Sequence, residues 1–141
     1  DLKMAKDSWL SLIMSYQIEP KLKQQKKCVV IYDFPKSQAS LAIIKGEIAQ
    51  RFEIYLNGIE LANGFQELLD PEEQKQRFQL DNEQRLEELK SPMVIDEYFI
   101  DSLKAGLPEC SGVALGVDRF IMAALDIKDI KEVMSFSIEN S

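Results

Sequence analysis

The sequence contains no histidine and only two cysteines, Cys28 and Cys110. Without an imidazole, the chain lacks the acid/base group on which many hydrolases and transferases depend near neutral pH. Because the two cysteines lie far apart and no C-x-x-C spacing occurs, a structural zinc site is excluded as well. We expect both cysteines to be reduced, partly buried thiols.

Long apolar runs are also missing. No stretch of about 18 apolar residues could span a bilayer, and the N-terminus lacks the basic and then apolar profile of a signal peptide. A cytoplasmic protein without membrane contact is expected. Basic residues are outnumbered, with 17 Lys and Arg against 24 Asp and Glu, which argues against a broad nucleic-acid surface. We interpret the one basic cluster as a solvated loop after Pro20; it consists of Lys21, Lys23, Lys26 and Lys27.

The chain has the length and composition of one globular domain, with 141 residues of which 45% are hydrophobic. Its first helix is predicted by apolar residues at helical spacing, with Asp7 as N-cap and Pro20 beyond the end. That stripe, expected to face the core, consists of Trp9, Leu12, Ile13 and Tyr16. A buried strand at 28–34 and a short helix over 41–48 are expected next.

Residues 51–67 predict a β-hairpin turned at Asn57-Gly58, the dipeptide best suited to a type I′ turn. This register pairs Tyr55 with Glu60 and Glu53 with Ala62, so both glutamates and Tyr55 share one face. The opposite face is expected to be the core side; it carries Phe52, Ile54, Leu56, Ile59 and Leu61. Two neighbouring carboxylates repel each other unless a cation lies between them, and Mg²⁺ is suited to that position. A hairpin with one wet, acidic face is the alternative.

Strict alternation along the second strand would place Asn63 and Glu67 on the core face, where an amide and a carboxylate fit poorly. We therefore predict a β-bulge or kink near residues 62–64, with Gly64 helping to permit it. Such a shift would turn Asn63 and Glu67 toward the side of Glu60 and form a polar pocket. A hairpin that is regular through Glu67 would contradict this prediction.

The polar segment at about 70–92 predicts a solvent-facing helical insertion, with Asp70 as N-cap and Pro71 at the first helical position. An amphipathic helix is expected over 95–103, ended by Gly106 and Pro108. A last turn and short strand are expected over 132–138.

Residues 112–119 predict a glycine-interrupted strand that runs into a helix. Gly112 and Gly116 lack a Cβ, so backbone or ligand can approach closely, and the helix start offers free N–H groups and a positive dipole end. Arg119 lies where both effects meet, a position suited to contacting a phosphate. Tight packing of strand and helix is the alternative.

Three segments, taken together and in this order, resemble the C-terminal part of the catalytic domain of lysine-specific class II aminoacyl-tRNA synthetases: residues 51–53, 58–68 and 106–119. The last segment resembles motif 3 of that class, and the resemblance covers the chain from about Cys28 to its end. Residues 32–42 and 108–112, with Ala114 where lysyl-tRNA synthetases usually have glycine, are closer to the branch that ligates lysine to elongation factor P. The fold implied is α+β, an antiparallel sheet flanked by helices.

The resemblance implies ATP-dependent activation of lysine or (R)-β-lysine as the adenylate, followed by transfer to a lysine of elongation factor P. The residues implied to hold Mg²⁺ and ATP are Glu53 and Glu60. Arg119 is implied to contact the terminal phosphate and, with Glu60, to serve catalysis. Asn63 and Glu67 are implied to contact the lysine substrate. A wall against substrate and adenosine is implied for Gly112, Ala114 and Gly116.

Motifs 1 and 2 of the class are absent from these residues, so we expect a C-terminal fragment of a longer enzyme that is inactive alone. The resemblance implies a homodimeric parent, whose dimer contacts would be made largely through motif 1. Two other functions stay open: a lysyl-tRNA synthetase that charges tRNA(Lys), and a non-catalytic synthetase-like binding module. The intact set of candidate site residues argues against the second of these.

Overall fold

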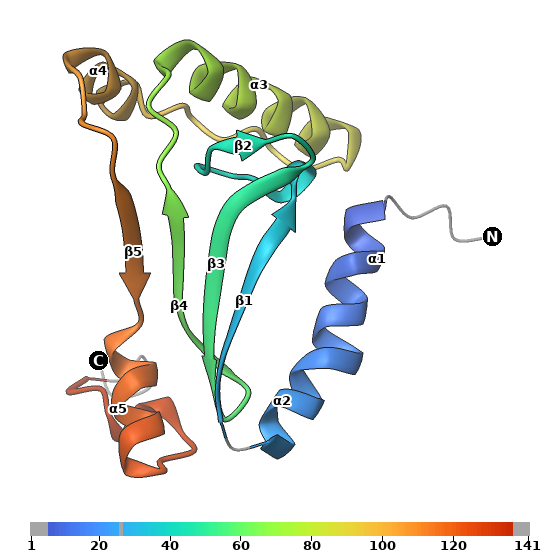
Figure 1. Ribbon diagram of the computed structural model, residues 1–141, viewed down its shortest axis with the longest axis vertical. Coiled ribbons are helices and arrows are strands. Elements are labelled where there is room, and N and C mark those ends of the chain that lie inside the picture. The colour runs from blue at the N-terminus through green and yellow to red at the C-terminus, as the bar shows by residue number, and fades with distance from the viewer. Residues whose placement is uncertain (1–5, 26, 137–141) are drawn as a thin grey trace.

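The computed structural model describes residues 6–25 and 27–136, which form an antiparallel sheet flanked by helices (Figure 1). The strand order is β1-β3-β4-β5, and β2 pairs with the outer part of β3. The α+β fold expected from the sequence is therefore confirmed. The helices and strands are α1 (Lys6–Ile13), a π-helical turn (Met14–Ile18), α2 (Glu19–Gln25), β1 (Cys28–Pro35), a 3-10 turn (Lys36–Gln38), β2 (Ile44–Lys45), β3 (Ile48–Leu56), β4 (Ile59–Gln66), α3 (Pro71–Glu87), α4 (Glu97–Ala105), β5 (Ser111–Leu115), α5 (Val117–Leu125) and a 3-10 turn (Ile130–Glu132).

The first helix is longer than predicted, because α1, the π-helical turn and α2 run on as one N-terminal helix over residues 6–25. The prediction that it ends before Pro20 was wrong. A proline inside a helix lacks its N–H and its ring presses on the carbonyl four residues before it. The π-helical turn ends two residues before Pro20, with the N–H of Glu19 bonded to the carbonyl of Met14, and this wider turn accommodates the ring. Lys21 and Lys23 are therefore helical rather than in a loop.

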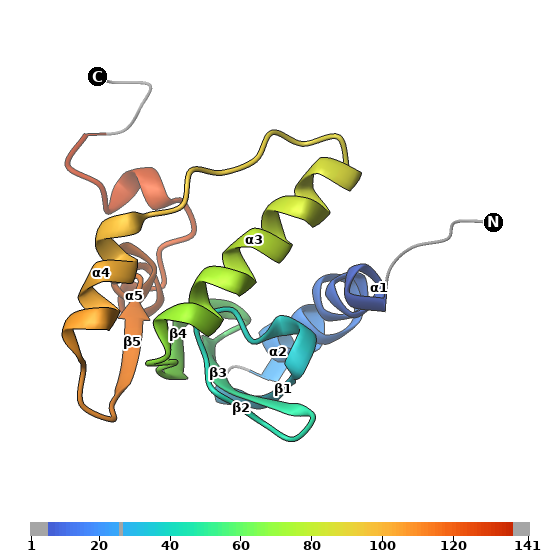
Figure 2. The same ribbon diagram turned by 90° about the horizontal axis from the view of Figure 1, so that it is seen from above.

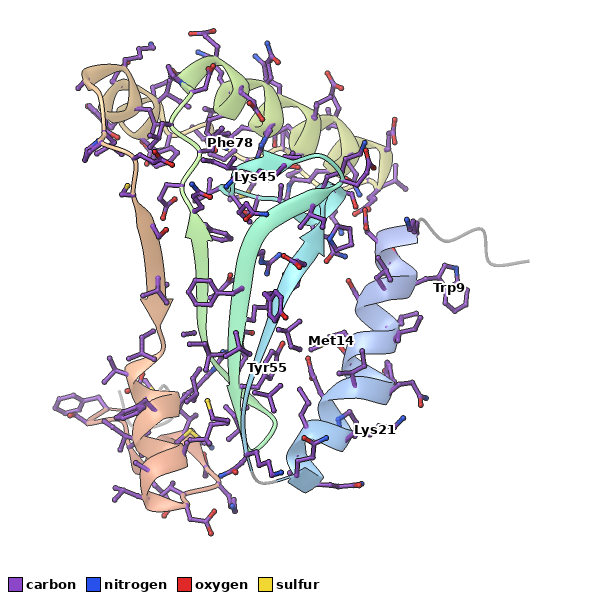
Figure 3. All side chains as sticks on the ribbon, in the orientation of Figure 1. Trp9, Met14, Lys21, Lys45, Tyr55 and Phe78 are labelled. Carbon is purple, nitrogen blue, oxygen red and sulfur yellow. The ribbon has the colours of Figure 1, made fainter. Side chains whose placement is uncertain are left out.

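The predicted apolar stripe of this helix is only partly turned to the sheet, because Ile13 lines the cavity there whereas Trp9 and Tyr16 do not. Trp9 points away from the sheet (Figure 3), and its exposed fraction is 48%, against 72% for Tyr16. Leu10, Met14 and Ile18 instead face the sheet across an open cavity. The helix therefore covers the sheet loosely, and the aromatic side chains lie outside.

The prediction of a short helix over 41–48 was wrong, because β2, the start of β3 and the turn between them form a tight hairpin there. Lys45 pairs with Ile48, so Gly46 and Glu47 make a two-residue turn in which Gly46 has a φ of +65°. Glycine adopts this conformation without the strain that other residues incur. The hairpin closes a small core of Ala39, Ala42 and Ala49, on which Phe34, Ile44 and Phe65 pack.

On β3 the two faces are buried in the opposite sense from the prediction, whereas Leu61 on β4 is buried as predicted. On β3 the buried residues are Ala49, Glu53 and Tyr55, whereas Phe52, Ile54 and Leu56 are only half-buried. The N-terminal helix lies on the side of Glu53 and Tyr55, which explains their burial. Strand β1 was expected to be buried but lies at the sheet edge, so Tyr32 is largely exposed.

Helices α3 and α4 lie at one end of the sheet, as Figure 1 shows, and α3 extends toward the side of the N-terminal helix (Figure 2). Asp70 caps α3 as predicted, because its carboxylate accepts hydrogen bonds from the next N–H groups at 2.9 and 3.0 Å. The helix is not wholly solvent-facing: Gln74 is buried, and Phe78 packs on Phe99 with ring centroids 6.1 Å apart. Helix α4 is confirmed, and Gly106 ends it with a φ of +93°.

The C-terminal residues differ in detail from the expectation. Helix α5 follows β5 as predicted; Met122 is its buried residue, whereas Phe120 and Leu125 are exposed by 49% and 66%. Residues 133–136 form no strand, and 137–138 lie outside the described residues. Both cysteines are free, Cys28 exposed and Cys110 half-buried. No helix within 6–25 and 27–136 is both long and apolar enough to cross a membrane.

Candidate functional site

The β3–β4 hairpin contains the predicted bulge, one residue earlier than expected. Asn57 and Gly58 have φ angles of +53° and +76°, and Tyr55 pairs with Glu60 as the sequence indicated. Beyond that pair the register shifts, so Ile54 lies opposite Ala62 and Glu53 lies opposite Asn63. Leu61 is therefore the extra residue on β4.

This bulge gathers the polar side chains on one face of the sheet, here called the polar face. Since cross-strand partners share a face, Asn63 joins Glu53, Tyr55 and Glu60 there, as predicted. Strand β5 continues the face, because Ala114 pairs with Asn63 and Gly112 pairs with Phe65. A regular hairpin would have turned Asn63 to the opposite side.

Glu67 lies just beyond β4, where its N–H donates to the carbonyl of Cys110 at 3.1 Å. Its carboxylate rests against Gly112: a Cβ built there would lie only 2.2 Å from Oε1. At Gly112 a backbone or ligand was predicted to approach closely; the group that does so is instead the side chain of Glu67. Burial raises the pKa of Glu67 above its ordinary value, and no cation within the described part of the chain forms an ion pair with it.

Arg51 was not predicted as a site residue, yet it bonds to three different parts of the chain. Its Nε donates to Asn63 Oδ1 at 3.3 Å, one terminal nitrogen donates to the carbonyl of Gln38 at 3.1 Å, and the other donates to Glu53 Oε1. The guanidinium carbon of Arg51 lies 4.5 Å from the ring centroid of Phe34 and 5.9 Å from the ring centroid of Phe65. The signal for Arg51 was its place two residues before Glu53, which puts both side chains on one face.

Tyr55 completes the cage around Glu53 from two residues further along the strand. Its hydroxyl donates to Glu53 Oε2 at 2.8 Å, so both oxygens of this buried carboxylate accept a hydrogen bond. Burial raises the pKa of Tyr55, and the hydrogen bond with Glu53 and the negative charges of Glu53 and Glu60 raise it further. The hydroxyl therefore stays protonated and remains a donor at physiological pH.

Glu60 and Arg119 meet at the turn end of the hairpin. Arg119 Nη1 donates to the backbone carbonyl of Glu60 at 3.2 Å and lies 4.0 Å from Glu60 Oε2. Helix α5 begins at Val117 after the N-cap Gly116, so Arg119 stands in its first turn with about half of its side chain exposed. A Cβ on Gly116 would make only ordinary contacts at 3.6 Å, so close approach does not require glycine there.

The donor chemistry of Glu53 and Glu60 fits a shared divalent ion, although no cluster of three or more acidic or thiol ligands occurs within the described ranges. Mg²⁺ takes one or two protein carboxylates and completes its shell with water and phosphate oxygens. Each carboxylate oxygen has two lone pairs, so the bonds from Arg51 and Tyr55 leave acceptor capacity on Glu53. The metal role of this pair stays a prediction.

An open cavity of about 690 Å³ separates the polar face from the N-terminal helix. Its sheet side is formed by Ile31, Arg51, Glu53, Tyr55 and Glu60. Figure 3 shows Tyr55 on the sheet and Met14 on the helix, on either side of this space. The remaining predicted residues lie on β4 and β5, just beyond β4, and at the start of α5; they are Asn63, Gly112 and Ala114, then Glu67, and then Gly116 and Arg119.

Comparison with known proteins places this chain in a family. Residues 10–140 match the family model of tRNA synthetases class II (D, K and N). The chain is 49% identical over 139 residues to the "Elongation factor P--(R)-beta-lysine ligase" of Pectobacterium atrosepticum, covering 96% of this chain and 42% of that protein. Proteins with the same name match from Avibacterium paragallinarum, at 51% identity with 96% and 43% covered, and from Vibrio atlanticus, at 49% identity with 100% and 44% covered. The chain thus spans less than half the length of these curated relatives. It belongs to the class II tRNA synthetases of the D, K and N group.

Proposed function

We propose that the whole protein activates lysine or (R)-β-lysine with ATP and transfers the resulting acyl group to a lysine side chain of elongation factor P. The names of the similar curated proteins support this reaction. The single observation that carries the proposal is the bulge at Leu61. It puts the carboxylates of Glu53 and Glu60 and the amide of Asn63 on one face of the sheet, and Arg119 bonds to the backbone of Glu60 at its end.

Glu67 and Asn63 are proposed to bind the amino acid. The Glu67 carboxylate is partly buried beside Gly112 and forms no ion pair with a cation of the described residues, so a substrate ammonium group would supply the charge partner. Asn63 lies two residues from the strand-paired Phe65 and can donate from its amide nitrogen. Together they would hold one ammonium group and one acceptor oxygen of the substrate.

Glu53, Glu60 and Arg119 are proposed to bind the phosphate end of ATP, with Gly116 beside them. Mg²⁺ held by the two carboxylates would supply neutralisation of the phosphate charge. Arg119 stands at a helix start, where a cationic fork and free N–H groups both favour an anion. The row from Glu67 to Arg119 would therefore place the amino acid and the phosphates side by side.

The chemistry proposed needs positioning and charge neutralisation rather than a protein base. A carboxylate oxygen of the substrate attacks the α-phosphorus of ATP, and the bond from that phosphorus to pyrophosphate breaks. In the second step the amine of the acceptor lysine attacks the acyl carbon, AMP leaves, and the amine loses a proton. The 141 residues given contain no histidine that could take part in either step.

Ala114 is proposed to help select the lysine isomer. It pairs with Asn63 across β4 and β5, so its methyl group stands on the polar face beside the proposed amino-acid site. Glycine at this position would leave that space open. We therefore propose that Ala114 favours (R)-β-lysine over α-lysine.

Lysine-dependent exchange of pyrophosphate into ATP tests the first step. The whole protein is incubated with ATP, Mg²⁺, labelled pyrophosphate and either α-lysine or (R)-β-lysine. Exchange that requires a lysine, and that is lost in Glu67→Ala, is the expected result. Exchange without any amino acid, or none with either lysine, would contradict the proposal.

The acceptor is tested separately by offering elongation factor P and tRNA(Lys) together. With labelled lysine or (R)-β-lysine as the substrate, we expect label in elongation factor P and not in the tRNA. We further propose that the whole enzyme is a cytoplasmic homodimer. Label in tRNA alone would instead identify a lysyl-tRNA synthetase.

A further inference from the structure

The guanidinium of Arg51 lies where the two proposed halves of the site meet. One terminal nitrogen holds Glu53, on the side proposed for metal and ATP, and Nε holds Asn63, on the side proposed for the amino acid. The remaining bond ties the cation to the carbonyl of Gln38. Only 18% of the Arg51 side chain and 10% of the Glu53 side chain are exposed, so water screens this arrangement little.

The bond from Arg51 also fixes which way the Asn63 amide faces. Arginine has five N–H donors and no acceptor, so it can meet only the oxygen of an amide. With Oδ1 turned to Arg51, the two hydrogens of the Asn63 amide nitrogen point to the other side, and no acceptor within residues 6–25 and 27–136 takes them up. An amide without this bond could turn its oxygen instead of its nitrogen to a substrate.

We infer that Arg51 is a positioning residue, which sets the orientation of the Asn63 amide and ties it to the Glu53 carboxylate; this rests on the proposed function above. The Phe34 and Phe65 rings also lie within cation–π distance of the guanidinium, and these contacts favour the position from which it reaches both partners. A lysine at position 51 would keep the charge but would lose the planar fork, and it could not hold both groups in this geometry. Arg51 does not contact the reacting atoms in this scheme.

A purely structural role for Arg51 makes different predictions. If Arg51 served only to attach the turn at residues 36–38 to the sheet, then Arg51→Lys would lower the melting temperature and the amount of active enzyme. The KM for the amino acid would be unchanged, because the surviving enzyme would bind it normally. The two roles are therefore separated by KM rather than by total activity.

The experiment measures lysine-dependent pyrophosphate exchange by the whole protein carrying Arg51→Lys, Asn63→Ala or both. We expect Arg51→Lys alone to raise the KM for the amino acid about tenfold. In the Asn63→Ala background the same change should alter KM by less than about twofold, since the amide on which it acts is gone. Equal effects in both backgrounds, or an unchanged KM for Arg51→Lys, would overturn the inference.

Arg77→Lys is the matched control. Arg77 is as buried as Arg51, with 15% of its side chain exposed, and it likewise bonds a carboxylate, Glu73, and two backbone carbonyls, those of Ser40 and Ala42. Within the described residues, Arg77 bonds to none of the side chains proposed to bind the amino acid, ATP or metal. We expect Arg77→Lys to leave KM at the wild-type value, and a rise equal to that of Arg51→Lys would overturn the inference.

A second readout does not depend on activity. The side-chain amide signals of Asn63 are identified in the ¹H–¹⁵N spectrum by their loss in Asn63→Ala. They should shift in Arg51→Lys but not in Arg77→Lys. Unshifted signals would overturn the inference even in an active enzyme. If the wild-type protein shows no lysine-dependent exchange, the proposed function is contradicted. A shift of the Asn63 amide signals in Arg51→Lys would still support the positioning contact in that case.

Discussion

Gly112→Ala should separate amino-acid recognition from stability. An added Cβ would lie 2.2 Å from Glu67 Oε1 and 3.3 Å from Glu67 Cδ, whereas ordinary contact begins at 3.4 Å. The oxygen must therefore retreat by about 1.2 Å, the difference between 2.2 and 3.4 Å. A displacement of about 1 Å at a substrate-positioning group can reduce the rate by roughly a hundredfold. We expect kcat/KM for the amino acid to fall by about 10- to 100-fold.

The same substitution should cost little stability. The group that must move is the end of a flexible side chain, and a changed rotamer costs about 0.5–1.5 kcal/mol. Replacing glycine by alanine in a compatible backbone returns about 0.4–1 kcal/mol by restricting the unfolded chain. We therefore expect the free energy of unfolding to stay within about 1 kcal/mol of wild type. Denaturant unfolding and pyrophosphate exchange, measured on the same preparation, check the two numbers.

Gly64→Ala is the comparison on the neighbouring strand. Its Cβ would meet the ring of Phe52 at 2.4 Å and the backbone carbonyl of Gly112 at 2.8 Å, and the carbonyl belongs to a paired strand. Such overpacking costs about 1–3 kcal/mol. An unchanged kcat/KM for Gly112→Ala, or a loss of stability as large as that of Gly64→Ala, would refute the reasoning about Glu67.

Three further predictions concern charge, hydrogen bonding and capping. Burial raises the pKa of Glu67 above its ordinary value of 4.5, so the native state loses stability as the pH rises from 4.5 through the native pKa. Glu67→Gln should remove this loss and therefore raise the Tm near neutral pH, but not below about pH 4.5. Thermal unfolding measured across this pH range checks the prediction. Tyr55→Phe should leave Glu53 Oε2 buried without a donor and lower the free energy of unfolding by about 1–3 kcal/mol, whereas unchanged denaturant unfolding would contradict that contact. Asp70→Ala should cost about 1 kcal/mol by removing the cap of α3, and an unaltered unfolding midpoint would argue against the cap.

Features decided by local chemistry were predictable from the sequence. The Asn57-Gly58 turn and the Asp70 cap depend on a few neighbouring residues, and both are present as expected. The bulge was predicted because Asn63 could not reasonably face a core. Its place at Leu61 could not be fixed, because small and apolar neighbours on either side tolerate both registers, and the pairing with β5 decides between them.

Other features depend on what the segment packs against. The spacing of apolar residues over 41–48 fits a helix as well as a hairpin, and the Gly46 turn decides in favour of the hairpin. Pro20 normally ends a helix, and the π-helical turn that admits it has no simple sequence signal. The sequence also could not show which sheet face is covered, since burial of Glu53 and Tyr55 results from the place of the N-terminal helix.

The arginine at position 51 was overlooked for a related reason. Its charge alone indicates nothing, and its importance follows from the simultaneous closeness of Glu53, Asn63 and Gln38, which come from three segments. Alternation along β3 placed it on the polar face, but only the register shift on β4 brought Asn63 within its reach.

The mass of elongation factor P after incubation with the whole protein, ATP, Mg²⁺ and (R)-β-lysine tests the central claim most directly. The account predicts an increase by one lysyl group that requires ATP, that is lost with Glu67→Ala, and that is not replaced by charging of tRNA(Lys) offered in the same tube. An unchanged mass beside charged tRNA, or an increase that persists undiminished in Glu67→Ala, would contradict it.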